Sequence, residues 1–288
     1  MAKTLFSIII TSYNQRNSIR NAVDSALAQG YAGREVIVVD DGSTDGSPAI
    51  LAGYGDAIQL VKHARNQGVC EARNAGAFQA VGEYLVFLDG DDILKPWALT
   101  VYGRIVEAFR PKLILSSLSL FQGPAPVLDP DTPPEIEIVR YDNLAEKDRS
   151  CRMSGSALVI EYQTFHKVDG WTRHFGLMED YDLTVKLAYS GRAIQILAPS
   201  LVLYRIHMTN MGHNIHGLIP GCLKLAAADR SRNYYFARSR RLVPCPLIGG
   251  PALMVVRRAW RAGLYAEGLK LCCARMIMSP SVPDRNVP

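Results

Sequence analysis

The chain has 288 residues and a formal net charge of +5, and 48% of its residues are hydrophobic and 20% charged. This is the composition of an ordinary soluble protein, and the length suits one α/β domain with appendages or two small domains. No run of about 20 apolar residues is present to cross a bilayer, and polar residues 12–14 interrupt the first apolar run, so we expect no signal peptide.

Five short apolar runs in the first 121 residues are predicted to be strands, and segments of helical length lie between them. Apolar strands that alternate with helices predict an α/β fold with a largely parallel sheet covered on both faces. In such a sheet, ligands bind beyond the carboxyl ends of the strands. The predicted strands are residues 6–10, 34–40, 58–63, 83–89 and 112–121, and the predicted helices lie near 15–29, 44–54, 68–81 and 95–109.

The rest of the chain is predicted to contain a proline-rich loop, one further strand and several helices. Residues 123–134 carry five prolines and are predicted to form a surface loop. A strand at 156–160 and a helix near 179–190 follow. After about residue 217 the chain is predicted to be helical and basic, with a break at 243–251, where prolines and glycines gather.

An acidic turn follows the fourth predicted strand, in the sequence VFLDGDDIL. Asp89 and Asp91 flank a glycine, so both carboxylates can turn toward one hard cation. Mg²⁺ commonly takes one or two protein carboxylates and completes its shell with waters and substrate phosphates. The alternative is a capping turn, and Asp92 is expected to cap the helix that starts near Pro96. For Asp89 and Asp91 together the pattern favours a metal that carries a diphosphate.

A second acidic pair, Asp40 and Asp41, lies at the end of the second predicted strand and therefore at the same edge of the sheet. Helix capping explains the Ser and Thr that follow, but it does not require paired carboxylates. A carboxylate at this position can accept a hydrogen bond from the imide N–H of a uracil or thymine ring. Tyr13, after the first strand, can supply a stacking face.

Six segments resemble the family 2 glycosyltransferases of GT-A fold, in their order and spacing. The resemblance covers about residues 5–212 and implies a mostly parallel central sheet flanked by helices, followed by a helical C-terminal extension. We therefore expect a GT-A domain at 1–217, with a donor half at about 1–110 and an acceptor half at about 111–217, and an extension at 218–288. The segments are SIIITSYNQ, VIVVDDGSTDGS, NQGVCEARNAG, EYLVFLDGDD, GLMEDYDLTVKLAYSGR and YRIHMTNM.

By this resemblance the site binds a nucleotide-sugar donor beside a divalent metal, Mn²⁺ or Mg²⁺. Asp89-Gly90-Asp91 resembles the family's DxD motif, with Asp91 on the metal and Asp89 nearer the ribose or sugar. His207 resembles a position that contacts the metal or the diphosphate, whereas a lone histidine is more often structural. Arg73 also suits a structural contact with the acidic strand ends, since a guanidinium has five donors. The resemblance assigns to the donor Thr11, Tyr13, Asp41, Arg73, Asn74 and Asp89.

Inverting transfer needs a base that takes the proton of the acceptor hydroxyl. In similar enzymes that base corresponds to Asp180, and Glu179 is the fallback, because a shift of one residue is compatible with the sequence. The helix dipole alone would also favour acidic residues in this first turn. Trp171 suits the floor of an acceptor site, since aromatic faces suit sugars, or equally the core.

The C-terminal segment is strongly basic, with 12 Lys and Arg against 3 Asp and Glu from Pro220 to Pro288. Residues 252–278 are predicted to form an amphipathic helix, which either packs on the domain or lies on an anionic membrane surface. Nucleic acid is a weaker interpretation, because no binding motif accompanies the charge. The apolar stripe of this helix is Leu253, Val256, Trp260, Leu264 and Leu271, beside Arg257, Arg258 and Arg261.

The resemblance implies a metal-dependent, inverting enzyme of the bacterial polysaccharide or glycolipid type. A UDP-sugar is the favoured donor, and a hydroxyl of a glycan or lipid-linked molecule is the acceptor. The alternatives are a nucleotidyltransferase, which the lack of glycine in residues 11–18 disfavours, and a non-catalytic sugar-nucleotide-binding module. Six cysteines without a CxxC pair predict a reducing cytoplasm, at the inner face of the membrane if the basic segment binds there.

Overall fold

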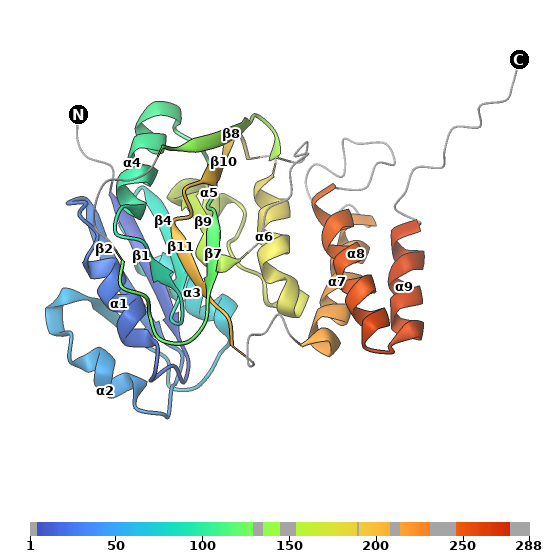
Figure 1. Cartoon of the computed structure of the whole chain (residues 1–288), viewed down its shortest axis with the longest axis horizontal. Helices are drawn as coiled ribbons and strands as arrows, with labels where there is room; N and C mark the ends of the chain where they lie inside the picture. Colours follow the sequence, from blue (N-terminus) through green and yellow to red (C-terminus); the bar gives the residue numbers. More distant parts are fainter. Residues whose placement is uncertain are drawn as a thin grey trace, which may run out of the picture.

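The computed structural model describes residues 5–128, 135–144, 154–188, 190–207, 214–230 and 246–276. Its centre is an eight-stranded sheet with the order β3-β2-β1-β4-β9-β6-β10-β8 (Figure 1). Only β9 and β8 run antiparallel to their neighbours in this sheet, which confirms the predicted α/β fold with a mostly parallel sheet. The strands are β1 (Phe6–Ser12), β2 (Arg34–Asp40), β3 (Gln59–Lys62), β4 (Tyr84–Asp89), β6 (Leu113–Leu115), β8 (Glu137–Tyr141), β9 (Leu158–Glu161) and β10 (Ala193–Ala198).

The central strand β1 is buried along its whole length, which is why its sequence is almost continuously apolar. It pairs with β2 on one side and with β4 on the other, and all three are parallel. In this register Ser12 lies opposite Asp40, and Thr11 lies opposite Asp89. The carboxyl ends of the three strands therefore meet at one edge of the sheet, where the sequence predicted a ligand site.

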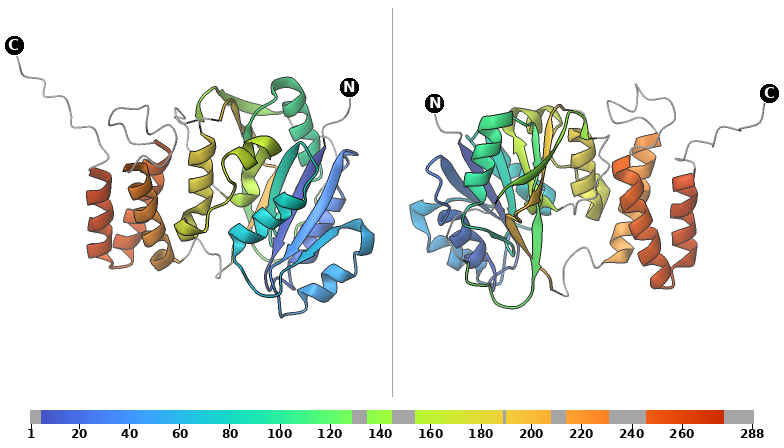
Figure 2. Two further views of the ribbon diagram at one scale, coloured as in Figure 1. Left: turned by 180° about the vertical axis from the view of Figure 1, so that it is seen from behind. Right: turned by 45° about the horizontal axis from the view of Figure 1, so that its top comes forward.

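Helices cover both faces of the sheet, and side chains alternate between two buried layers (Figures 1 and 2). Ile8 and Ile10 of β1 pack in one layer, and Ile9 packs in the other. The first layer is completed by α1 (Ile19–Leu27), α2 (Ser47–Ala52) and α4 (Ala98–Phe109), and the second by α3 (Val69–Gln79), α5 (Tyr162–Lys167) and α6 (Glu179–Leu187).

The predicted strand at 112–121 is wrong as a single element. It divides into β6 of the large sheet and β7 (Leu118–Phe121), which joins a small three-stranded sheet with β11 (Val202–Arg205) and β5 (Ile93–Leu94). The division lies at Ser116, whose hydroxyl is 2.7 Å from the Tyr102 hydroxyl, and beyond it the backbone pairs with β11. This small sheet carries Arg205 and leads to His207, beside the acidic edge.

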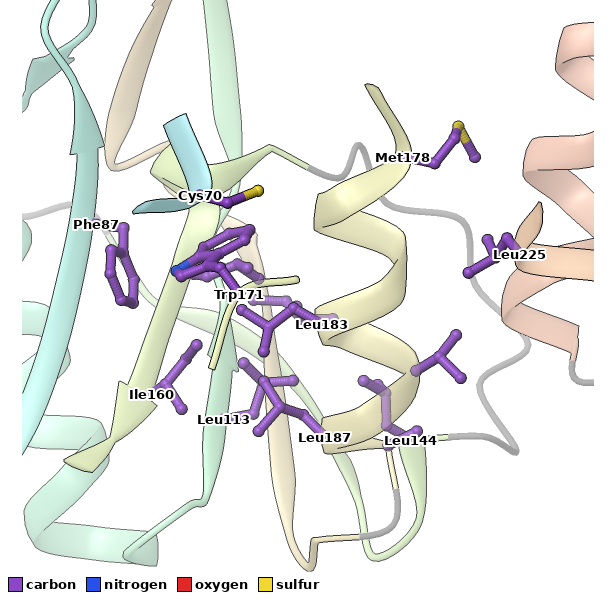
Figure 3. Close-up of a cluster of buried hydrophobic side chains, with 14 of the residues drawn as sticks. Cys70, Phe87, Leu113, Leu144, Ile160, Trp171, Met178, Leu183, Leu187 and Leu225 are labelled. Carbon is purple, nitrogen blue, oxygen red and sulfur yellow. The ribbon is translucent and has the colours of Figure 1, made fainter. Parts of the chain in front are cut away.

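The C-terminal helices α7 (Ile215–Arg230), α8 (Pro246–Arg261) and α9 (Tyr265–Met276) lie side by side, with α9 farthest from the sheet (Figures 1 and 2). Met178, at the start of α6, faces Leu225 of α7 (Figure 3). These side chains belong to one buried cluster that continues into the large sheet, so the extension shares the core of the domain. The division at residue 217 stays a prediction.

Two predictions about this segment are wrong. The break at 243–251 does not hold where the structure describes it, because α8 begins at Pro246 and continues through Pro251; residues 243–245 lie outside the described ranges. The single helix predicted at 252–278 ends at Arg261 and restarts at Tyr265, after a turn in which Gly263 has a φ of +76°. No helix in the described ranges has the length and hydropathy needed to cross a bilayer.

Candidate functional site

Arg73, on α3, lies at the centre of the acidic edge and is buried. Its Nη2 donates to Oδ1 of Asp89 at 2.8 Å, and its Nη1 lies 3.3 Å from Oδ1 of Asp180 and 3.6 Å from Oε1 of Glu179. Burial alone would lower the pKa of the guanidinium, but the three carboxylates raise it, so the cation is retained. One buried cation therefore connects the end of β4 to the first turn of α6.

Asp89 ends β4 and is held from two further directions. Its backbone N–H donates to the Ser156 hydroxyl at 2.9 Å, and its Oδ1 lies 3.5 Å from the Thr11 hydroxyl. The next residue, Gly90, lies so close to β1 that an added Cβ would be 2.7 Å from the carbonyl oxygen of Thr11. Only glycine fits at this position, and the turn can then present Asp89 and Asp91 on the same edge.

Asp91 and His207 form the second pair of the site, with His207 Nε2 2.8 Å from Asp91 Oδ2. Burial raises the pKa of Asp91, and so does the charge of Asp89, while the hydrogen bond from His207 lowers it. Asp91 lies in the turn between β4 and β5, His207 lies just after β11, and the two residues are 116 positions apart in the sequence. The structure thus brings together the two residues that the sequence predicted for the metal.

The donor set of this pair fits a divalent metal of the Mn²⁺ type. A carboxylate oxygen and a neutral imidazole nitrogen are both ligands of divalent metals, and the direct 2.8 Å contact between Asp91 Oδ2 and His207 Nε2 would be replaced by bonds to the ion. Within the described ranges, no group of three or more His, Cys, Asp and Glu side chains has the geometry of a metal site. Further ligands would therefore come from water and from a diphosphate.

Asp92 does not cap the following helix, which corrects the prediction made for it. The next helix, α4, begins at Ala98, and Asp92 instead turns inward and is buried. Its Oδ2 accepts a hydrogen bond from the Ser156 hydroxyl at 2.6 Å, and its Oδ1 accepts one from the backbone N–H of Arg205 at 2.9 Å. Asp92 thereby fixes the acidic turn to both β9 and β11, since Ser156 directly precedes β9.

Glu179 and Asp180 begin α6, but their environments differ. The Glu179 side chain is only 5% exposed, and burial, with the charge of Asp180, raises its pKa to about 8. The Asp180 side chain is 21% exposed at the site. Its pKa is also raised by burial, although Arg73 lowers it. Of the two predicted bases, Asp180 therefore has the more accessible side chain.

The predicted base-binding residues lie at the ends of β1 and β2. Asp41 is buried, and its Oδ1 is 2.7 Å from His63 Nδ1, while its Oδ2 accepts the backbone N–H of Gly68 at 2.8 Å. These contacts fix the loop that leads into α3, so a nucleotide base would have to share the same oxygens. Tyr13 is exposed, with its ring accessible to a base. Base recognition by Asp41 and Tyr13 stays a prediction.

Asn74, which was predicted to contact the donor, and Trp171, which was predicted for an acceptor floor or equally for the core, contact each other. The Asn74 side-chain amide donates to the Trp171 carbonyl at 2.9 Å and accepts from its N–H at 3.0 Å. Asn74 therefore holds the segment before α6 against α3, and the donor contact predicted for it stays a prediction. Trp171 is 3% exposed, packs edge-on against Phe87 and lies against Arg73, so it belongs to the core and not to an acceptor floor (Figure 3).

Sequence reasoning missed Ser156, His63 and Arg205, which position the acidic side chains without themselves resembling a motif. Arg205 donates from Nε to the carbonyl oxygen of Asp91 at 3.0 Å. The local signal for Arg205 was its position two residues before the predicted His207, since alternate residues of an extended segment point to the same side. The other two pair with residues far away in the sequence and carry no local signal.

Residues 7–109 match the family model described as Glycosyl transferase family 2. A protein of Rickettsia bellii, named as an uncharacterized glycosyltransferase, is 34% identical over 194 residues, which are 64% of this chain and 27% of that protein. The succinoglycan biosynthesis protein ExoO of Rhizobium meliloti is 41% identical over 91 residues, 31% of this chain and 26% of that protein. The chain thus spans about a quarter of the length of these two relatives.

Two solved structures share the arrangement of elements. The S. aureus TarS fragment 1–349 in complex with UDP-GlcNAc superposes with a TM-score of 0.64 at 15% identity, over 95% of this chain and 88% of that one. The mannosyltransferase PcManGT of Pyrobaculum calidifontis, in complex with GDP-Man and Mn²⁺, gives a TM-score of 0.61 at 16% identity, over 98% and 78%. At these identities the likeness concerns the fold, including most of the C-terminal extension.

Proposed function

We propose that this chain is a metal-dependent, inverting glycosyltransferase, because residues 7–109 match the model of glycosyltransferase family 2 and the fold resembles the solved transferase structures. It moves a sugar from a nucleotide-diphosphate donor, with a UDP-sugar favoured, to a hydroxyl of a glycan or lipid-linked acceptor. The observation that carries this proposal is the contact of one buried arginine, Arg73, with both Asp89 at the end of β4 and Asp180 at the start of α6.

The reaction is a single displacement, and each site residue has one part in it. Asp91 and His207 would hold the metal, which when bound offsets negative charge on the departing nucleoside diphosphate. Asp180 takes the proton of the acceptor hydroxyl. The acceptor oxygen bonds to the anomeric carbon as the bond from that carbon to the phosphate oxygen breaks, so the configuration inverts. Arg73 stays buried and positions Asp180 and Asp89 at a fixed separation.

Related proteins support the choice of donor and acceptor class. The two superposed structures hold UDP-GlcNAc and GDP-Man, so the fold accepts both bases, and our preference for UDP depends on Asp41 and Tyr13. The relative ExoO carries the name of a polysaccharide biosynthesis protein, which favours a glycan or lipid-linked acceptor. The free Cys70, Cys222 and Cys272 agree with the reducing cytoplasm that we propose for the chain.

The test is a transfer assay with UDP-, dTDP- and GDP-sugars, Mn²⁺ and a panel of glycan acceptors, in which the released nucleotide is identified. We expect nucleoside diphosphate from the wild type and from Asp56→Asn, an exposed control carboxylate, and none from Asp180→Asn or Asp91→Asn when both remain folded. Release of pyrophosphate would indicate a nucleotidyltransferase. Donor binding without transfer to any acceptor would indicate a non-catalytic module.

A further inference from the structure

Most of the apolar stripe predicted from the sequence does not face outward from the C-terminal helices, with Trp260 as the exception. Val256 of α8 and Leu271 of α9 are buried, together with Ala252, Val255 and Ala259. They belong to the cluster that joins α7, α8 and α9 to the large sheet. Most of the predicted stripe thus packs within the protein, and a largely different set of side chains lies on the solvent-exposed sides of α8 and α9.

The outward side of α8 is cationic. Arg257 and Arg261 are exposed, and their spacing of four residues places them on one side of the helix, opposite the buried Ala252 and Ala259. Neither arginine has a hydrogen bond or an ion pair with another residue in the described ranges. Within the described ranges these two charges are therefore solvated by water and are available to an external anion.

The outward side of α9 adds large apolar side chains. Tyr265 is 68% exposed and Leu269 is 61% exposed, and their spacing of four residues also places them on one side of the helix. Lys270 is also exposed, but it points about 100° around the helix from Leu269. Trp260, at the end of α8, is half exposed and lies against Gly268 of α9, where an added Cβ would be 2.2 Å from its ring.

These side chains form one continuous surface, because α8 and α9 are antiparallel neighbours joined by the turn at Gly263. On α8 the buried side is marked by Ala259, the side facing α9 by Trp260 and the outward side by Arg261. On α9 the same order is Leu271, Gly268 and Leu269. The order runs in the same rotational sense along each chain, so it is mirrored when two antiparallel helices are viewed from one end. Both outward sides therefore face in the same direction. We call this surface the outer face; it consists of Arg257, Trp260, Arg261, Tyr265 and Leu269.

We propose that the outer face docks on an anionic lipid surface. Trp and Tyr have apolar rings with a polar end, which suits the boundary between lipid headgroups and acyl chains. Lys and Arg beside them gain roughly 1 kcal/mol each near an anionic leaflet. A helix that lies flat in the interface with one side inserted is a common form of such contact.

The charge distribution orients the whole molecule on such a surface. Residues 1–219 contain 20 Lys and Arg against 24 Asp and Glu. This part of the chain is therefore weakly acidic and is repelled by anionic headgroups. The helices with the outer face lie at the end of the molecule away from the large sheet (Figures 1 and 2). Nucleic acid also attracts cations, but it offers no apolar phase for Leu269 and Tyr265.

The experiment is co-sedimentation of the full chain with vesicles of phosphatidylcholine, alone or mixed with phosphatidylglycerol. Arg257→Gln with Arg261→Gln tests the charges, and Tyr265→Ser with Leu269→Ser tests the apolar part. Matched controls lie outside the C-terminal helices: Arg104→Gln with Lys62→Gln, which remove the same charge, and Phe78→Ser with Val81→Ser, which remove exposed apolar surface at and just after the end of α3.

We expect binding to the mixed vesicles only, reduced about fivefold per removed arginine and reduced again by the Tyr265 and Leu269 substitutions, while both control pairs bind like the wild type. No vesicle binding by the wild type would overturn the proposal. Equal loss in the outer-face variants and the controls would also overturn it, as would binding of duplex DNA without binding of vesicles. The readout is independent of sugar transfer, so failure of the proposed enzymatic function leaves this result unaffected.

Discussion

Arg73 and Asp180 lie 3.3 Å apart, nitrogen to oxygen, although 107 residues separate them in the sequence. The same guanidinium contacts Asp89 at 2.8 Å, so one side chain sets the separation of two carboxylates from different halves of the domain. Removing one partner from a buried ionic group leaves the other charges without compensation. Both activity and stability should therefore depend on the forked shape of this side chain.

Arg73→Lys is expected to lower kcat by at least about 100-fold, on the scale seen when a positioned catalytic group loses its support. A lysine keeps the charge but has one nitrogen, which cannot contact Asp89 and Asp180 with two separate donors. We also expect KM for the donor to change less than kcat, because Arg73 is buried and acts on the carboxylates. Steady-state kinetics with the folded variant test this, and an unchanged kcat would contradict it.

Gly155→Ala should disturb the same contact from the other side. An added Cβ at Gly155 would be 2.2 Å from Nη2 of Arg73, so the guanidinium would have to move. We expect a loss of activity of about 10-fold or more, on the scale of a small misplacement of catalytic groups. Gly30→Ala is the control, since its Cβ would meet no atom within 4 Å. Equal activity of the two alanine variants would contradict the role given to Arg73.

Glu179→Gln separates the buried neighbour from the base. The folded pKa of Glu179 lies above its ordinary value of 4.5, at about 8, so the folded protein holds this proton more tightly than the unfolded chain. Its contribution to the free energy of unfolding is therefore fully present below pH 4.5 and is lost as the pH rises through 8. Glutamine does not titrate and mimics the protonated form.

Wild type and Glu179→Gln should consequently have similar unfolding free energies near about pH 5, and the variant should be more stable near about pH 9, by on the order of 1–3 kcal/mol. Urea unfolding at both pH values measures the difference, and the variant should retain transfer activity because Asp180 is unchanged. The same stability difference at both pH values would contradict the claim that burial raises the pKa of Glu179.

Metal and nucleotide are expected to bind together. Asp91 and His207 provide two ligands, so Mn²⁺ alone should bind weakly, and a diphosphate should complete its shell. We expect Mn²⁺ to tighten UDP binding about 10-fold, or about 1.4 kcal/mol, and His207→Gln to remove that gain. His174→Gln, at an exposed position, is the control. Calorimetric titrations that give the same UDP affinity with and without Mn²⁺ would contradict this expectation.

The donor half of the fold could be predicted because its information is local. The runs around Ile9 and Ile37 are apolar throughout, and only a strand covered on both faces has that pattern at this length. The run at 112–121 looked similar, but Ser116 and the pairing of Leu118 with β11 divide it between two sheets. Pairing over a long distance in the sequence decides that division, and hydropathy does not report it.

Part of the candidate site also has a local signal in the sequence. The DxD pattern located Asp89 and Asp91, and the glycine between them is required by the approach of β1. The resemblance favoured Asp180 as the base, with Glu179 as the fallback, because both occupy the first turn of one helix. Tertiary packing leaves the Asp180 side chain more exposed than that of Glu179. The sequence carried no signal for the contact between Asn74 and Trp171, because these residues are 97 positions apart in the sequence.

The central claim is that a divalent metal binds at Asp91 and His207 together with the diphosphate of the donor. Crystals soaked with UDP and Mn²⁺ and measured at the manganese absorption edge test it most directly. We predict one anomalous peak within bonding distance of Asp91 Oδ2 and His207 Nε2, and continuous density from that peak to the diphosphate. An anomalous peak elsewhere, with the 2.8 Å contact between these two side chains unchanged while UDP is bound, would contradict the account.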